Sequence, residues 1–129
     1  MTVKKHIFIV AGESSGDQHA ARYITEHKRL NPNLTFSAIG QNEIINAGAD
    51  VILNSEKISV VGIVEVVSKY RQISSALDTA YKHIEKTMPD LIVLVDYVEF
   101  NLKIAKYAKT RGIKVLFYIA PQVWAWREK

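Results

Sequence analysis

The chain has 129 residues, 48% of them hydrophobic, which suits one globular domain with a sizeable core. It has no cysteine, which excludes a disulfide framework and a cysteine-based zinc site and favours a reducing, cytoplasmic setting. The net charge is +4, but no basic run is interleaved with aromatic residues, so nucleic acid is not an expected partner and an anionic lipid surface is at least as good a candidate.

Strand and helix signals alternate along the chain. Apolar runs and alternating patterns predict strands at 7–10, 34–39, 51–53, 91–95 and 114–119. Helical spacing predicts helices at 17–30, 41–47, 63–88 and 100–110. The third of these exceeds the usual length, so we expect a break or bend near 70–75. The alternation predicts an α/β fold with a doubly wound, Rossmann-like parallel sheet, whose first and fourth strands are adjacent.

A glycine turn follows the first predicted strand. Gly12 and Gly16 lie four residues apart, without the third glycine of a dinucleotide fingerprint or the lysine of a phosphate loop. Glu13 would repel a bound pyrophosphate and suits the hydroxyls of a sugar better. Asp17 is expected as the N-cap or first-turn acid of the next helix. A strand-to-helix turn without chemistry remains the alternative interpretation.

Asp96 is the best candidate for a reacting group. It directly follows the continuous apolar run at 91–95, which is typical of a central parallel strand. A carboxylate at the carboxyl end of such a strand borders the crevice where ligands bind, and it can act as a general base there. Glu99 and Asn101 could orient Asp96 or bind ligand hydroxyls. Helix capping explains all three residues equally well without catalysis.

A dense apolar segment precedes and opens the third predicted helix. Its side chains are too many for one helical stripe, so we expect some of them to remain exposed and to contact a membrane or a partner. This membrane patch consists of Val60, Val61, Ile63, Val64 and Val67. No run of about 18 apolar residues occurs, so any membrane contact is expected to be peripheral.

Metal and cofactor chemistry is not expected. The four histidines form no pair at metal-ligand spacing, and nothing in the pattern indicates a cofactor. Trp124 and Trp126 follow the last predicted strand, where packing in the core or an interface and stacking on a sugar ring are both open readings.

Five stretches, in this order and spacing, carry a family resemblance: Ala11–Asp17 (AGESSGD), Val61–Val66 (VGIVEV), Asp96 with Phe100–Asn101, Gly112–Lys114, and Pro121–Arg127 (PQVWAWR). Together they resemble the amino-terminal domain of lipid-A-disaccharide synthase along nearly all of the chain. That family looks like a two-domain glycosyltransferase of the GT-B type. The resemblance implies inverting transfer of 2,3-diacylglucosamine from UDP to the 6-hydroxyl of 2,3-diacylglucosamine 1-phosphate, with no metal or other cofactor.

The resemblance also assigns residues. Asp96 matches the family's proposed base, and the membrane patch matches a surface that faces the inner membrane from the cytoplasm. The residues implied on the acceptor side are Gly12, Glu13, Ser14, Ser15, Gly16, Asp17, Asn101, Gln122 and Trp124.

The chain departs from the family at two places. The family usually reads D-x-P-D-F-N where this chain has Asp96 to Asn101 (DYVEFN), so a proline is lost and one acid is longer. A Gly-Gly-Pro-Arg turn is replaced by Gly40 to Glu43 (GQNE), which removes an arginine that could contact an anionic ligand.

Domain content is the last expectation. Residues 1–129 are expected to form a single acceptor-side domain, without the carboxyl-terminal domain that binds the UDP-sugar donor in this family. Such a chain is expected to be inactive alone. The alternative is a non-catalytic module that keeps the fold to bind lipid or a partner.

Overall fold

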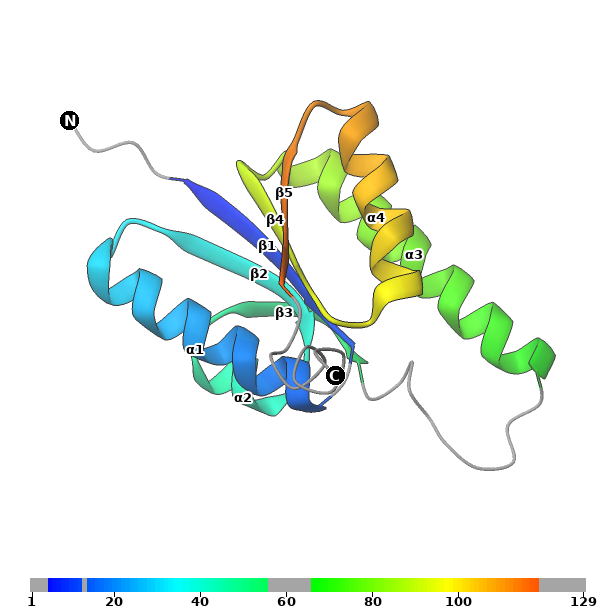
Figure 1. Ribbon diagram of the computed structural model, residues 1–129, viewed down its shortest axis with the longest axis horizontal. Helices are drawn as coiled ribbons and strands as arrows, with labels where there is room; N and C mark the ends of the chain where they lie inside the picture. Colours follow the sequence, from blue (N-terminus) through cyan, green and yellow to red (C-terminus); the bar gives the residue numbers. More distant parts are fainter. Residues whose placement is uncertain (1–4, 13, 56–65, 119–129) are drawn as a thin grey trace, which may run out of the picture.

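The apolar runs form one parallel five-stranded sheet in the computed structural model, which describes residues 5–12, 14–55 and 66–118. The strands are β1 (His6–Ala11), β2 (Thr35–Gly40), β3 (Asp50–Asn54), β4 (Leu91–Val95) and β5 (Lys114–Tyr118). The helices are α1 (Ser14–Leu30), α2 (Asn42–Asn46), α3 (Val66–Thr87) and α4 (Val98–Thr110). The strand order is β3-β2-β1-β4-β5, so β1 and β4 are adjacent as predicted (Figure 1).

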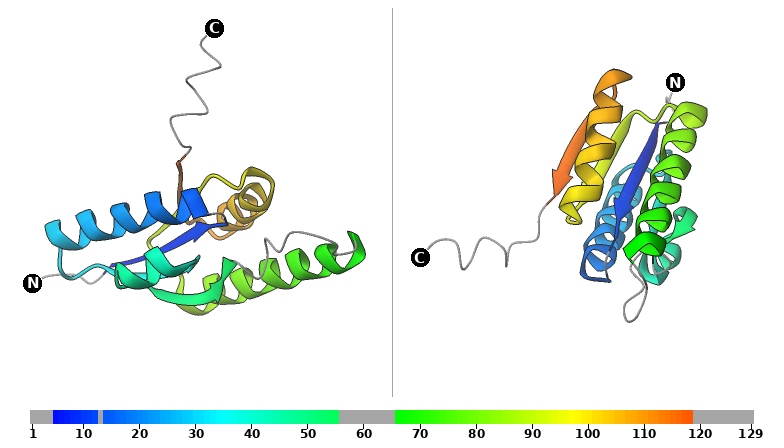
Figure 2. Two further views of the ribbon diagram at one scale, coloured as in Figure 1. Left: turned by 90° about the horizontal axis from the view of Figure 1, so that it is seen from below. Right: turned by 90° about the vertical axis from the view of Figure 1, so that its right-hand side faces the viewer.

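The sheet is covered on both faces. Phe8 and Val10 of β1 join a core cluster with residues of α3 and α4, whereas Ile7 and Ile9 join a second cluster with residues of α1 and α2. Alternate side chains of one strand therefore serve two helical layers, which Figure 2 shows on opposite faces of the sheet. The predicted doubly wound α/β fold is confirmed.

The predicted break in the third helix is wrong. α3 is one uninterrupted helix of 22 residues, and it contains neither proline nor glycine, the usual causes of a kink. Its amino-terminal end projects past the sheet (Figure 1), and Tyr70 there is 71% exposed. The helix needs no bend, because its amino-terminal part extends past the sheet and does not have to curve around the core.

Two further details differ from the sequence pattern. α1 begins at Ser14, three residues before the predicted start, so Gly16 lies inside its first turn. In α4, Leu102 is 51% exposed, although it is a large apolar residue within the predicted helix. Phe100 and Asn101 face the interior instead.

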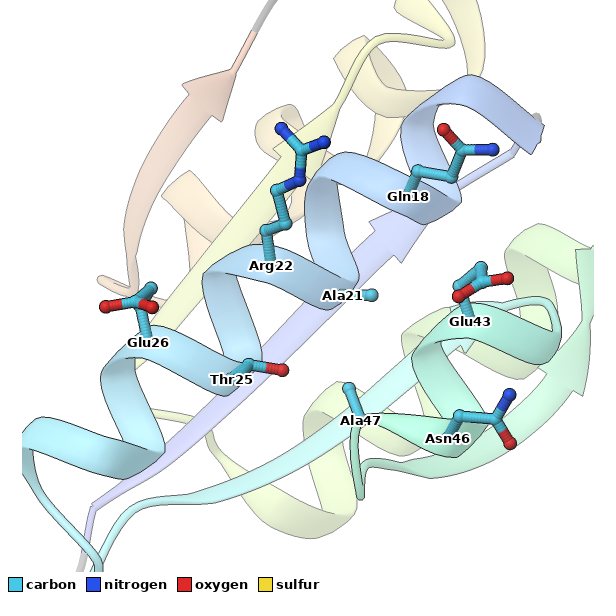
Figure 3. Close-up of a pocket in the computed structure, with 8 residues that line it drawn as sticks. All are labelled: Gln18, Ala21, Arg22, Thr25, Glu26, Glu43, Asn46 and Ala47. Atoms are coloured by element: carbon cyan, nitrogen blue, oxygen red, sulfur yellow. The ribbon is translucent and has the colours of Figure 1, made fainter.

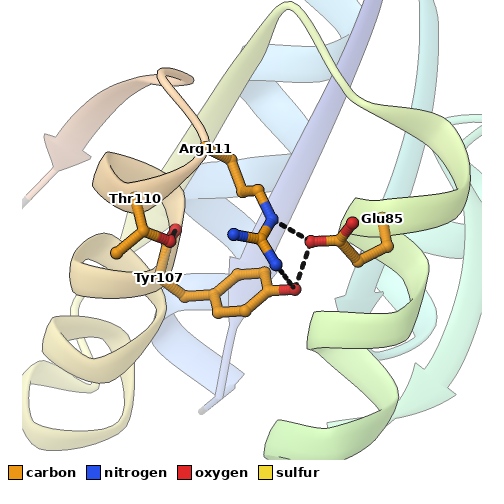
Figure 4. A network of polar contacts seen from close by, with 4 residues as sticks. All are labelled: Glu85, Tyr107, Thr110 and Arg111. Carbon is orange, nitrogen blue, oxygen red and sulfur yellow. Dashed lines mark hydrogen bonds and ion pairs between the residues drawn. The ribbon is translucent and has the colours of Figure 1, made fainter.

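Aromatic stacking joins α3 to α4 on the outside of the molecule. The rings of Tyr81 and Tyr107 stack with centroids 4.3 Å apart. Glu85 accepts hydrogen bonds from the Tyr107 hydroxyl and from the Arg111 guanidinium (Figure 4). Since the two charged side chains are 45% and 41% exposed, their ion pair contributes little to stability.

Two histidines and a serine link β1, β2 and α3 near the amino ends of the strands. Ser37 Oγ lies 2.7 Å from His6 Nε2 and 2.6 Å from His83 Nε2. Thr35 Oγ1 donates to the Lys5 carbonyl, so it accepts from His6 Nδ1 at 2.7 Å. Neutral His6 therefore accepts from Ser37 through Nε2, and His83 donates to Ser37. The network is complete with both rings uncharged.

Acid is expected to destabilise the fold through this cluster. Burial lowers the pKa of both His6 and His83; nearby Asp90 and Asp50 oppose the shift at His6, and for His83 the neighbouring His6 and Lys86 add to it while Asp50 opposes it. Because the unfolded chain then binds more protons than the folded chain, the free energy of unfolding falls as pH drops below about 6.5.

Urea unfolding measured between pH 7.5 and pH 5 checks this pH dependence. His83→Gln, which keeps a donor for Ser37, should flatten it. His27→Gln, on α1 outside the cluster, should not. An equal slope in the His83 variant and the parent would contradict the assignment.

Candidate functional site

Two loops leave the sheet together at its carboxyl edge. Ala11, the last residue of β1, pairs with Val95, the last residue of β4. Gly12 and Asp96 follow these residues directly, so the predicted turn and the predicted base lie at the same edge, as the topology required.

The Tyr97 ring occupies the space beside Gly12. A Cβ atom at position 12 would overlap the ring carbons of Tyr97, which stacks on Phe100 with centroids 5.1 Å apart. At Gly16 a Cβ would lie 3.4 Å from Cγ1 of Val95, where α1 crosses β4. Gly12 thus allows one loop to pack on the other, whereas a Cβ at Gly16 would make only an ordinary van der Waals contact with Val95. The family resemblance had implied that both glycines lie on the acceptor side.

The backbone after β4 is left-handed at two consecutive residues. Asp96 has φ of 49° and Tyr97 has φ of 43°. This conformation costs a non-glycine residue roughly 1–2 kcal/mol, although aspartate tolerates it better than most. The Asp96 amide donates to the Tyr118 carbonyl at 2.9 Å, which continues the β4–β5 ladder into the loop. Asp96 is half-buried and lies one residue beyond the strand.

Asn101 is completely buried beneath these loops. Its Nδ2 donates to the Asp96 carbonyl at 2.9 Å and approaches the carbonyls of Val95 and Val10 at 3.4 and 3.5 Å. Its Oδ1 has no hydrogen-bond partner among the residues that the structure describes. The side chain therefore joins the ends of β1 and β4 to the first residue of the loop.

Asp17 holds a neighbouring helix in place. It is 2% exposed, and its carboxylate accepts from the backbone amides of Gln41 at 2.6 Å and Glu43 at 2.9 Å. It lies in the first turn of α1, as predicted, but it is not that helix's N-cap because α1 begins at Ser14. Both oxygens accept hydrogen bonds from the start of α2, so in this structure Asp17 connects α1 to α2.

Several predicted site residues lie outside the part of the chain that the structure describes: Glu13, Gln122, Trp124, and the patch residues Val60, Val61, Ile63 and Val64. Ser14 and Val67 belong to α1 and α3, but their side chains are not described. Ser15 is exposed in the first turn of α1. Tyr97 was missed as part of the site; its place directly after Asp96 was the one signal that the sequence offered.

A groove of about 540 Å³ lies elsewhere, between α1 and α2. Gln18 and Arg22 of α1 line it opposite Glu43 and Asn46 of α2 (Figure 3). None of the predicted site residues that the structure describes lines this groove. Within the described ranges, no three histidine, aspartate or glutamate side chains gather as metal ligands would, and no helix is both long and apolar enough to cross a membrane.

Comparison with known proteins identifies the family of this chain. The family model described as lipid-A-disaccharide synthetase matches residues 7–129. The chain belongs to this family. Lipid-A-disaccharide synthase of Nitrosococcus oceani is 50% identical over 122 residues, which cover 95% of this chain and 32% of that protein. The Coxiella burnetii synthase is 44% identical over 123 residues, 95% of this chain and 33% of that protein. The chain thus spans about a third of these synthases.

Solved structures agree on the fold. A glycotransferase of kitacinnamycin superposes with a TM-score of 0.64 at 12% identity, covering 92% of this chain and 31% of that chain. The glycosyltransferase SsfS6 of Streptomyces sp. SF2575 superposes with a TM-score of 0.55 at 16% identity, covering 89% and 39%. The predicted fold class, a Rossmann-like domain of the GT-B kind, and the resemblance to the lipid-A-disaccharide synthase family are both confirmed.

Proposed function

We propose that this chain forms the acceptor side of a lipid-A-disaccharide synthase. The reaction transfers 2,3-diacylglucosamine from UDP to the 6-hydroxyl of 2,3-diacylglucosamine 1-phosphate, giving the β-1,6 disaccharide and UDP. The observation that carries this proposal is the family match over residues 7–129, which includes Asp96 and the glycine turn together at the carboxyl edge of the sheet.

Asp96 is proposed as the general base. Its carboxylate takes the proton from the acceptor's 6-hydroxyl while that oxygen attacks the anomeric carbon of the donor. The new C–O bond forms as the bond to UDP breaks, and the electron pair of that bond leaves with UDP. Attack from the face opposite the leaving group inverts the anomeric centre.

The other predicted residues divide into two groups. Gly12, Gly16 and Asp17 are buried and set the shape of the loop. Exposed Ser15 is proposed to contact the acceptor, together with Glu13, Ser14, Gln122 and Trp124. The UDP-sugar donor is proposed to bind the portion of the synthases that this chain does not span.

A chimera tests the function. This chain replaces the matched segment of the Nitrosococcus oceani synthase, which is 50% identical. Purified chimera is incubated with UDP-2,3-diacylglucosamine and the acceptor, and the disaccharide is measured by mass spectrometry. Product at a rate comparable to that of the parent synthase is expected. A folded but inactive chimera would favour the non-catalytic alternative.

Peripheral binding to the cytoplasmic face of the inner membrane is the second part of the proposal. In the sequence, α3 directly follows the segment that holds most of the patch residues, and it contains Val67. Its first turns project from the sheet (Figure 1), and Tyr70 there is exposed. Apolar side chains beside scattered lysines suit an anionic bilayer surface.

The chain is therefore expected to sediment weakly with anionic vesicles. Val64→Asp with Val67→Asp should reduce partitioning on the order of tenfold or more, since each exposed side chain contributes about 1 kcal/mol. Circular dichroism controls for folding. Ile45→Asp, at an exposed position on α2, is the matched control. Unchanged partitioning of the double variant would remove this segment from membrane binding.

A further inference from the structure

We propose that Asn101 is the positioning residue for Asp96, because it holds the left-handed backbone from which the Asp96 side chain leaves. The inference rests on the proposed role of Asp96 as the base. It gives Asn101 a different task from the acceptor contact that the family resemblance implied.

Asn101 binds both residues of the left-handed pair. Its side-chain Nδ2 donates to the Asp96 carbonyl at 2.9 Å, and its backbone amide donates to the Tyr97 carbonyl at 3.0 Å. Left-handed conformations at residues other than glycine persist only where the surroundings impose them. One residue at the start of α4 supplies a hydrogen bond to each of these two peptide groups.

The amide is also anchored to the sheet. Nδ2 lies 3.4 Å from the Val95 carbonyl and 3.5 Å from the Val10 carbonyl, at the ends of β4 and β1. A buried amide group that faces three carbonyl oxygens has a defined orientation, because the reversed orientation would place its own oxygen against them. Asn101 therefore fixes the position of the Asp96 backbone relative to the ends of β1 and β4.

Burial argues against a direct contact with the acceptor. Asn101 is 0% exposed, whereas Asp96 is half-buried at the same edge of the sheet. Among the contacts that the structure describes, the Asn101 side chain reaches Asp96 at its backbone carbonyl, so its effect on a reaction at Asp96 is expected to pass through the backbone. Small displacements of a catalytic group are costly, so such a residue should affect kcat more than substrate binding.

Nuclear magnetic resonance of the isotope-labelled chain tests the contact itself. Scalar couplings report φ at Asp96 and Tyr97 in the parent, in Asn101→Ala and in Asn46→Ala, a control at an exposed position on α2. In Asn101→Ala, φ of Asp96 should leave the positive region or average with negative values. Positive φ at both residues in a folded Asn101→Ala chain would overturn the inference.

A second variant serves if Asn101→Ala fails to fold. Asn101→Asp has the same shape, and its carboxyl can donate to the Asp96 carbonyl only while it carries a proton. The left-handed geometry should then persist in acid and be lost once the carboxyl ionises. Geometry that persists after ionisation would also overturn the inference.

Kinetics in the chimera separate positioning from binding. Asn101→Ala should lower kcat roughly 10- to 100-fold and leave KM for the acceptor within about twofold, with Asn46→Ala like the parent. A raised KM with unchanged kcat would assign Asn101 to acceptor binding and overturn the inference. Failure of the proposed function can be told apart from failure of this inference. It would appear as an inactive parent chimera or as a fully active Asp96→Asn variant. The resonance measurement tests the inference without any need for activity.

Discussion

Asp96→Asn in the chimera is expected to lower kcat by roughly 10²–10⁴-fold, the usual contribution of a general base. The amide keeps the size and shape of the carboxylate but cannot take the acceptor's proton. Since the Asp96 amide donates a hydrogen bond to the Tyr118 carbonyl and the Asp96 carbonyl accepts one from Asn101, the loop should keep its conformation in the variant. Steady-state rates with both substrates at saturation measure the effect.

The control for this experiment is a neighbouring carboxylate. Glu99 lies in the first turn of α4, three residues after Asp96, and it is exposed. Glu99→Gln removes the same charge from the same loop region and should leave kcat within about threefold of the parent. Near-normal turnover of Asp96→Asn would remove Asp96 from the mechanism.

Asp17→Ala is expected to lower the free energy of unfolding by about 2–4 kcal/mol. The carboxylate is buried and accepts from the backbone amides of Gln41 and Glu43. Its removal leaves two donors without an acceptor and detaches α1 from the start of α2. Urea denaturation of the isolated chain, followed by circular dichroism, measures the change.

Asp78→Ala is the matched comparison for Asp17→Ala. Asp78 is 63% exposed and pairs with Lys82 at 3.0 Å on α3, so its loss should cost less than about 1 kcal/mol. If the two variants were equally stable, the buried carboxylate would not be what holds α2.

The fold was predictable wherever one local signal dominated. The apolar run at 91–95 became β4 with the same boundaries, and strand-helix alternation gave the correct neighbours for β1. Predictions were wrong where two local conformational preferences were nearly equal in strength. Ser14, Ser15 and Gly16 favour a turn, yet they open α1, and the length of α3 suggested a bend that no residue in it induces.

The shared edge of the two loops was predictable because parallel topology places both of them at the carboxyl ends of adjacent strands. Its contacts were not, since they join residues that are distant in sequence. Asp17 reaches an amide 24 positions further on, and the ring of Tyr97 lies beside Gly12 only because β1 and β4 are neighbours. A local pattern shows that an aspartate or asparagine side chain can bind a backbone group. It does not show which backbone group the side chain will bind.

The contact between Gly12 and the Tyr97 ring links the side-chain sizes that positions 12 and 97 can accept. Any side chain at position 12 would need the space that the ring fills, so a larger residue there requires a smaller residue at position 97. Among members of this family, the amino acids at these two positions are therefore expected to covary in size. The same interlock means that a ligand which displaced one loop would also have to move the other, so the proposed acceptor contacts on the glycine loop would be coupled to the placement of Asp96.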